Sequence, residues 1–132
     1  MEEEFTRAIG MRTVRMEGGE CAIELELTPM HQSTARRAHG GVLFTMLDTA
    51  MGRAVISRLP EGRGCATLEA RMNFFRPVQA GRLRAEGRVV TLTRRTAYAE
   101  GSLLDAQERL VARASGTFFL TETLVQSERE RV

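Results

Sequence analysis

The sequence predicts an α+β fold, in which an antiparallel sheet wraps around one long apolar helix. The chain has 132 residues, about the length of one domain. Residues 40–58 form an apolar run that is too long for a strand. Two strand candidates precede this run, and four follow it with short connections, which favour antiparallel pairing. We therefore expect a single domain over residues 1–132, with its core at about 11–121.

The segment before the long helix is expected to form a short helix and two strands. Acidic residues begin the stretch 2–9 and suit the N-terminal end of a helix dipole. Residues 11–16 form a strand candidate, and Gly18-Gly19 make a tight turn after it. From residue 23 to residue 28 apolar and polar side chains alternate, which indicates a half-buried strand. A loop then leads to the long helix.

The long helix has the sequence GGVLFTMLDTAMGRAVISR. It is apolar around most of its circumference, which predicts burial on several sides. Thr45, Asp48, Thr49 and Gly52 follow the i, i+3, i+4, i+7 spacing and form one narrow stripe of polar or small residues. A Pro-Glu-Gly sequence at 60–62 ends the helix.

The second half of the chain is expected to consist of strands. The candidates lie at about 65–75, 83–93, 96–105 and 109–121. The connections that separate them are Gly81-Arg82, Arg94-Arg95 and Ala106-Gln107. The charged segment Ser127 to Val132 is expected to fray.

Composition excludes several classes of protein. Hydrophobic residues make up 42% and charged residues 27%, and nineteen arginines against seventeen acidic residues give a net charge of only +2, which argues against a nucleic-acid partner. No apolar run reaches the ~20 residues of a membrane span, and the N-terminus lacks a signal-peptide core. Cys21 and Cys65 lack metal-ligand spacing and are expected to be buried thiols. We expect a cytoplasmic protein without metal, cofactor or membrane partner.

The segment 38–54, AHGGVLFTMLDTAMGRA, carries the chemistry. Two glycines at a helix start let the backbone approach a ligand, and the free N–H groups there can bind an oxyanion. A simple tight turn is the alternative interpretation. Asp48 is a carboxylate in apolar surroundings, so it is either paired within the core or a base or nucleophile at the floor of a cleft.

Asp48 and Gly40 are too far apart to act on the same carbonyl within one chain. Eight residues separate them, which is about 12 Å along a helix. A second copy with its helix antiparallel to the first would bring Asp48 of one subunit to Gly40-Gly41 of the other, in two equal sites.

This segment resembles the signature of the PaaI-like hot-dog thioesterases, within the 4-hydroxybenzoyl-CoA thioesterase-type superfamily. The resemblance extends over roughly residues 11–121 and includes TLEARMNFFRPV (67–78), GRLRAEGRVV (81–90) and VARASGTFFL (111–120). It implies a hot-dog fold, with a curved antiparallel sheet around a central helix. It also implies hydrolysis of an acyl-CoA thioester, a homodimer as the minimal active unit, and a homotetramer of two dimers.

The resemblance assigns roles to individual residues. Asp48 corresponds to the family's general base or nucleophile, and Gly40 to the backbone N–H that polarises the thioester carbonyl. His39 corresponds to the motif histidine, which either caps and orients the helix start or transfers a proton. Thr67 corresponds to a hydroxyl that helps to hold the attacking water.

One position departs from the family pattern. Ser33 stands where relatives often carry an asparagine that contacts the substrate carbonyl or water. Ser33 or Gln32 could replace it, or both could be plain loop residues. Thr49 and Phe75 are candidates for the acyl pocket, with helix packing and core or dimer contact as their alternatives.

Phosphate binding and substrate choice stay open at this point. The arginines that could bind CoA phosphates, or could be solvated strand residues, are Arg71, Arg76, Arg82, Arg94 and Arg95. The expected activity is hydrolysis of a small aryl- or medium-chain acyl-CoA. The alternative is a non-catalytic acyl-CoA-binding protein on the same fold.

Overall fold

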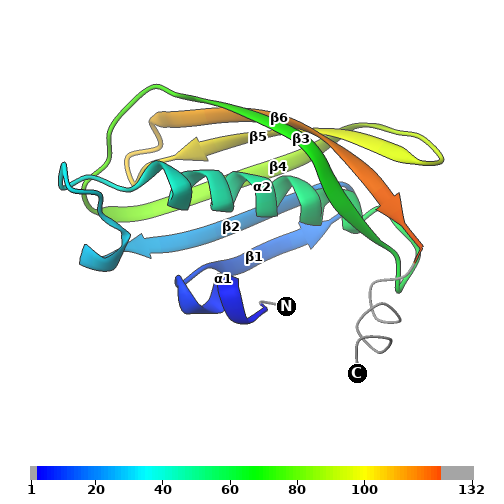
Figure 1. Cartoon of the computed structure of the whole chain (residues 1–132), viewed down its shortest axis with the longest axis horizontal. Coiled ribbons are helices and arrows are strands. Elements are labelled where there is room, and N and C mark those ends of the chain that lie inside the picture. Colours follow the sequence, from blue (N-terminus) through cyan, green and yellow to red (C-terminus); the bar gives the residue numbers. More distant parts are fainter. Residues whose placement is uncertain (1–2, 123–132) are drawn as a thin grey trace.

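A six-stranded antiparallel sheet curves around one long helix in the computed structural model, which describes residues 3–122 (Figure 1). The strand order is β1-β2-β4-β5-β6-β3. The helices are α1 (Glu4–Ala8) and α2 (Gly40–Ile56), with a 3-10 helix η1 (Pro29–His31). The strands are β1 (Arg12–Glu17), β2 (Glu20–Leu27), β3 (Gly64–Phe74), β4 (Gly81–Leu92), β5 (Thr96–Leu104) and β6 (Leu110–Thr121). This is the predicted α+β hot-dog architecture, and the predicted Ser127 to Val132 segment lies outside the described residues.

Helix α2 fills the concave side of the sheet. Its sheet-facing side chains, among them Met46, Leu47 and Met51, are fully buried, as the apolar sequence predicts. The predicted stripe of Thr45, Asp48, Thr49 and Gly52 is only half-buried, because the sheet does not cover that side of the helix. The stripe is therefore accessible to a ligand or a second molecule.

A glycine in β4 lets the helix backbone touch the sheet backbone. A Cβ atom added to Gly87 would lie 2.5 Å from the carbonyl oxygen of Ala50 in α2. The neighbouring Gly101 in β5 meets the flexible tip of Leu47 at 3.0 Å instead. The depth at which α2 sits in the sheet is thus set by the absence of a side chain at residue 87.

Three boundaries differ most clearly from the predictions. Gly81 and Arg82 were expected to be a connection, but they begin β4 and pair with Leu27 and Glu26. β2 begins at Glu20 rather than at residue 23, because it is paired on both sides from its first residue, with β1 and with β4. The long helix ends at Ile56, two residues earlier than predicted.

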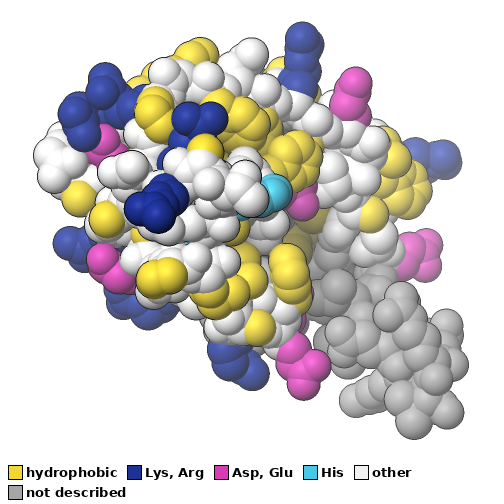
Figure 2. Space-filling view, turned by 60° about the vertical axis from the view of Figure 1, so that its left-hand side comes forward, with side chains coloured by type: hydrophobic (Ala, Val, Ile, Leu, Met, Phe, Trp, Pro, Cys, Tyr) yellow, Lys and Arg dark blue, Asp and Glu magenta, His cyan; other side chains and the backbone are white. Residues whose placement is uncertain are grey.

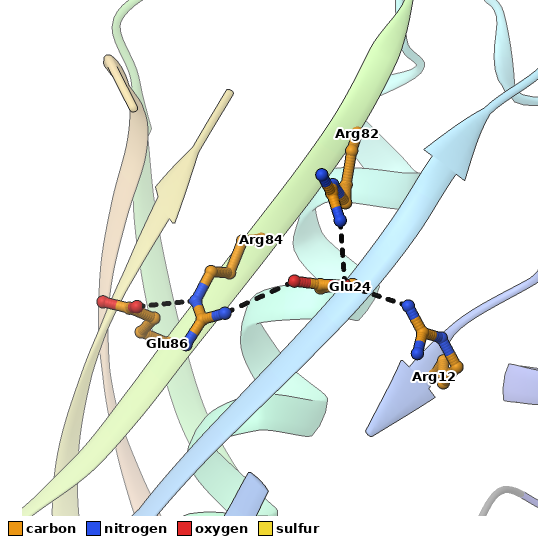
Figure 3. Close-up of polar contacts among 5 residues, drawn as sticks. All are labelled: Arg12, Glu24, Arg82, Arg84 and Glu86. Atoms are coloured by element: carbon orange, nitrogen blue, oxygen red, sulfur yellow. Dashed lines mark hydrogen bonds and ion pairs between the residues drawn. The ribbon is translucent and has the colours of Figure 1, made fainter. Parts of the chain in front are cut away.

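Ion pairs lie across the outer face of the sheet (Figure 3). The Glu24 carboxylate in β2 accepts from Arg12 at 3.0 Å and from Arg84 at 3.3 Å, and Arg82 lies 3.6 Å away. Arg84 also donates to Glu86 at 2.8 Å. These pairs link three adjacent strands. They include Arg82, one of the arginines whose role the sequence left open.

Strand β3 forms one end of the sheet. Its neighbour is β6, and the described chain provides no strand for its other edge. Leu68 on this strand is 61% exposed, which is unusual for a large apolar side chain in a sheet. No helix in the described part of the chain is long and apolar enough to cross a membrane.

Candidate functional site

Asp48 and Thr67 meet where β3 runs beside α2. The Thr67 hydroxyl donates to Asp48 Oδ1 at 2.8 Å. Asp48 is half-buried and Thr67 is exposed, and Asp48 makes no ion pair with an arginine of the described chain. The carboxylate is therefore not a paired core residue, and its second oxygen can act on a ligand.

The first turn of α2 presents a free backbone donor. His39 is the N-cap, and its Nδ1 accepts from the N–H of Gly41 at 2.8 Å, so the capping interpretation of His39 is confirmed. In the neutral ring the proton then lies on Nε2. The N–H of Gly40 has no acceptor within residues 3–122 and is exposed. Unpaired N–H groups at a helix start attract negative charge.

The loop before α2 is anchored by a histidine that sequence analysis did not single out. His31 is 3% exposed, its Nδ1 accepts from the N–H of Thr28, and its Nε2 donates to the carbonyl oxygen of Ile9. The backbone N–H of His39 donates to the carbonyl oxygen of His31 at 2.8 Å. The capping box formed by Thr28 and His31 was the available sequence signal. This anchor fixes the position from which α2 begins.

The two candidates for the missing asparagine make contacts with backbone groups of the loops around them. The Ser33 hydroxyl accepts from the N–H of Ala35 at 3.3 Å. The Gln32 side chain donates to the carbonyl oxygen of Gln79 at 3.3 Å. Neither contact joins these side chains to Asp48 or Gly40.

An apolar hollow of about 350 Å³ lies beside the start of α2. Its lining includes Gly40, Leu43, Phe74 and Phe75. The ring of Phe74 lies against Gly40, 3.8 Å from the position of an added Cβ, so Phe74 lines this hollow together with the candidate Phe75. Both phenylalanines are at least half exposed, so they are not part of this chain's core. An acyl or pantetheine group could pack here.

Asp48 and Gly40 remain separated within one chain. They lie on the same straight helix, eight residues or about 12 Å apart. Thr49 lies on the half-buried stripe next to Asp48. The described residues contain no cluster of three His, Cys, Asp or Glu side chains suited to a metal.

The thiol of Cys65 reports on the charge of Asp48. Cys65 is half-buried rather than buried as predicted, and its thiol donates to the carbonyl oxygen of Gly52 at 3.5 Å. Burial raises the pKa of Cys65 to about 11, and the negative charge of Asp48 contributes to the rise. The thiol is therefore protonated at neutral pH and a weak nucleophile.

We expect Asp48→Asn to lower the pKa of Cys65, because it removes the charge while the burial remains. The measurement is the rate of Cys65 alkylation against pH, in a Cys21→Ala background. In the parent protein alkylation at pH 8 should be slow, since only about a thousandth of the thiol is ionised. An unchanged pH profile in Asp48→Asn would contradict the placement of Asp48 beside this strand.

Comparison with known proteins identifies the family. A family model described as Thioesterase superfamily matches residues 37–112, which include the start of α2, Asp48 and Thr67. The solved structure of a conserved protein from Pseudomonas aeruginosa is 29% identical, covers 91% of this chain and 95% of its own, and superposes with a TM-score of 0.88. A variant of the phenylacetic acid degradation protein PaaI from Thermus thermophilus is 33% identical, with 89% and 98% covered and a TM-score of 0.81.

A more distant structure shows the same fold. A thioesterase from Haemophilus influenzae is 18% identical, with 93% of this chain and 86% of that chain covered and a TM-score of 0.87. The family match spans more than half of the chain, and the resemblance seen in its sequence is confirmed. The chain belongs to the thioesterase superfamily and is a hot-dog-fold hydrolase.

Proposed function

We propose that the protein hydrolyses the thioester of a small aryl- or medium-chain acyl-CoA, at a site built from two copies of the chain. The observation that carries the proposal is the 2.8 Å hydrogen bond from Thr67 to Asp48 on the open side of α2. It pairs a carboxylate with a hydroxyl in a position that a water and a carbonyl can reach. The family match supports thioester chemistry at that position.

A second copy of the chain would bring an Asp48 side chain close to Gly40. The open side of α2 and the free edge of β3 adjoin each other, and large apolar side chains lie on them: Phe44 is 41% and Leu68 61% exposed. A two-fold axis beside these elements places the two helices antiparallel, with Asp48 of each copy near Gly40 of the other. The same contact covers both apolar side chains, so we propose a homodimer. The homotetramer stays a prediction.

The proposed reaction begins with polarisation of the thioester. The carbonyl oxygen accepts from the N–H of Gly40, where the helix carries a partial positive charge. Asp48 of the other copy takes a proton from a water molecule while the water oxygen attacks the carbonyl carbon. Thr67 holds Oδ1 of Asp48, which leaves Oδ2 for the water. The tetrahedral intermediate carries its negative charge at Gly40.

Collapse of the tetrahedral intermediate releases the two products. The C–S bond breaks, the free acid leaves, and the CoA thiolate takes the proton that Asp48 received. Direct attack by Asp48, which forms an anhydride, is the alternative route. Label found in Asp48 after a single turnover in ¹⁸O-labelled water would identify the anhydride route, because the general-base route puts label only into the released acid.

Release of free thiol from a panel of aryl and aliphatic acyl-CoAs tests the activity. Hydrolysis of any member supports the proposal and names the acyl group. Saturable binding of the same compounds without thiol release would instead indicate the non-catalytic binder. In that case the engagement of Ser33 and Gln32 with backbone groups of nearby loops would explain the missing step.

Purified heterodimers of two inactive variants test the shared site. Gly40→Pro removes the N–H and adds a ring whose Cβ has room, 3.8 Å from Phe74. Proline is favoured at the first helical position, and His39 already has the extended backbone (φ −63°, ψ 135°) that precedes proline. Each homodimer, Gly40→Pro or Asp48→Asn, should lose about 100-fold or more in rate. The heterodimer keeps one intact site of two, so we expect about half of the wild-type activity. Inactive heterodimers would place both groups in one copy.

A further inference from the structure

Three connections and the first turn of α2 gather at the end of the molecule where α2 begins. They are the β2–α2 loop, the first turn of α2, the β3–β4 loop and the β5–β6 turn (Figure 1). The N–H of Ala38 donates to the carbonyl oxygen of Val78 at 2.7 Å, which joins the first and third of these loops. The joined loops form a wall beside Gly40, and that wall carries charge.

Two arginines on this wall have no acidic partner. Arg37 and Arg76 both line the apolar hollow beside Gly40, and neither makes an ion pair or side-chain hydrogen bond with any residue from 3 to 122. The arginines on the outer face of the sheet differ from them: Arg84 and Arg88, for example, are paired with glutamates. Figure 2 shows basic side chains beside exposed hydrophobic ones on the face turned toward this end.

A second hollow continues from the first. It measures about 360 Å³, and it shares Arg37, Pro77 and Val78 with the hollow beside Gly40. Arg109 lies at its far side, where Asp105 accepts from Arg109 Nε at 2.8 Å. Hydrogen bonds from Arg109 and Gln107 lower the pKa of Asp105 below its usual value, against the effect of burial, so this carboxylate is ionised and neutralises Arg109. The uncompensated positive charge is thus that of Arg37 and Arg76.

The order of these surfaces matches the order of groups in a CoA thioester. The carbonyl at Gly40 is followed by an apolar hollow that suits the pantetheine arm. The unpaired Arg37 and Arg76 also line this hollow, and Arg37 borders the second hollow as well. Guanidinium groups bind phosphates through charge-assisted and bidentate hydrogen bonds. Of the five arginines that the sequence offered for this role, Arg76 lines this hollow, while Arg94 and Arg95 lie on the β4–β5 turn at the opposite end (Figure 1).

We propose that Arg37 and Arg76 bind the phosphates of the CoA nucleotide, and that the protein therefore selects a phosphate-bearing thiol carrier over a bare pantetheine thioester. This inference rests on the proposed function for its substrate. It adds the residues that distinguish one carrier from another, and it assigns Arg37, which sequence analysis did not consider.

Equilibrium binding of CoA itself tests the proposal without turnover. The variants are Arg37→Gln and Arg76→Gln, titrated with CoA, with CoA lacking its 3′-phosphate, and with pantetheine. Each substitution should weaken CoA binding roughly 10-fold and pantetheine binding much less, and added salt should reduce the difference. Arg58→Gln is the matched control, since Arg58 is an exposed arginine beyond the far end of α2, about 24 Å or more from Gly40.

The kinetic counterpart separates this proposal from the proposed function. With an acyl-CoA, the two variants should raise KM about 10-fold at constant kcat, and with an N-acetylcysteamine thioester, which has no phosphates, the rise in KM should be much smaller. Equal losses on both substrates, or unchanged CoA binding, would overturn the arginine assignment while leaving thioester hydrolysis intact. A wild-type protein that binds CoA through these arginines but releases no thiol would refute the proposed function and support this inference.

Discussion

The substitution Asp48→Asn is expected to lower kcat for acyl-CoA hydrolysis about 10²–10⁴-fold, with the fold retained. The amide keeps the size of the side chain and can still accept from Thr67, but it cannot take a proton from water or attack the thioester. The measurement is thiol release under saturating substrate, accompanied by the melting temperature of both proteins. Asp48 is half-buried and forms no ion pair in the described chain, so its replacement should cost little stability.

Thr67→Val serves as the companion variant. It removes the hydroxyl that positions Asp48 while keeping the shape of the side chain, so we expect a smaller loss, about 10-fold, carried by kcat. The double variant should be no slower than Asp48→Asn alone, because Thr67 acts through the carboxylate. Normal turnover by Asp48→Asn would remove Asp48 from the mechanism altogether.

The largest effect on stability is expected from Gly87→Ala. The added methyl group would lie 2.5 Å from a backbone oxygen of α2, and neither the helix nor the central strand β4 can move without disturbing the packed core. We expect a loss of about 3 kcal/mol or more in the free energy of unfolding, or a melting temperature lower by roughly 10 °C or more. Thermal or urea unfolding monitored by circular dichroism measures this loss.

Gly101→Ala is the matched comparison for Gly87→Ala. It makes the same chemical change on the adjacent strand, but the nearest atom is the tip of Leu47, which can rotate. Its cost should be clearly smaller, about 1 kcal/mol. Equal costs for the two variants would show that contact with the helix backbone is not what makes residue 87 special.

The elements of the fold were predictable because their patterns are local. The long apolar helix and the alternating strand at 23–28 each follow from a few neighbouring residues. The position of β3 in the sheet could not be predicted in this way. β3 follows α2 in the chain but pairs with β6, and pairing between distant segments leaves no periodic signal in the sequence. The start of β4 was missed because Gly81 reads as a turn residue, although it pairs with Leu27.

The candidate site, too, was predictable only where its residues are close together in the sequence. His39 and Gly40 were recognisable because capping and helix-start chemistry lie in adjacent residues. The family resemblance pointed to Thr67, but only the structure supplies its contact with Asp48, which requires β3 to lie beside α2. Arg37 escaped notice, because its position beside Gly40 depends on the packing of two loops that are far apart in the sequence.

The pairing of β3 with β6 also has a consequence for a newly synthesised chain. Asp48 and Thr67 are 19 residues apart in the sequence, and both are synthesised before β6. The strand that holds β3 in the sheet, β6, is the last one in the described chain. Until residues 110–121 have been synthesised, Thr67 has no strand to keep it against the helix. We therefore expect a chain that ends before residue 110 to lack the contact between Asp48 and Thr67.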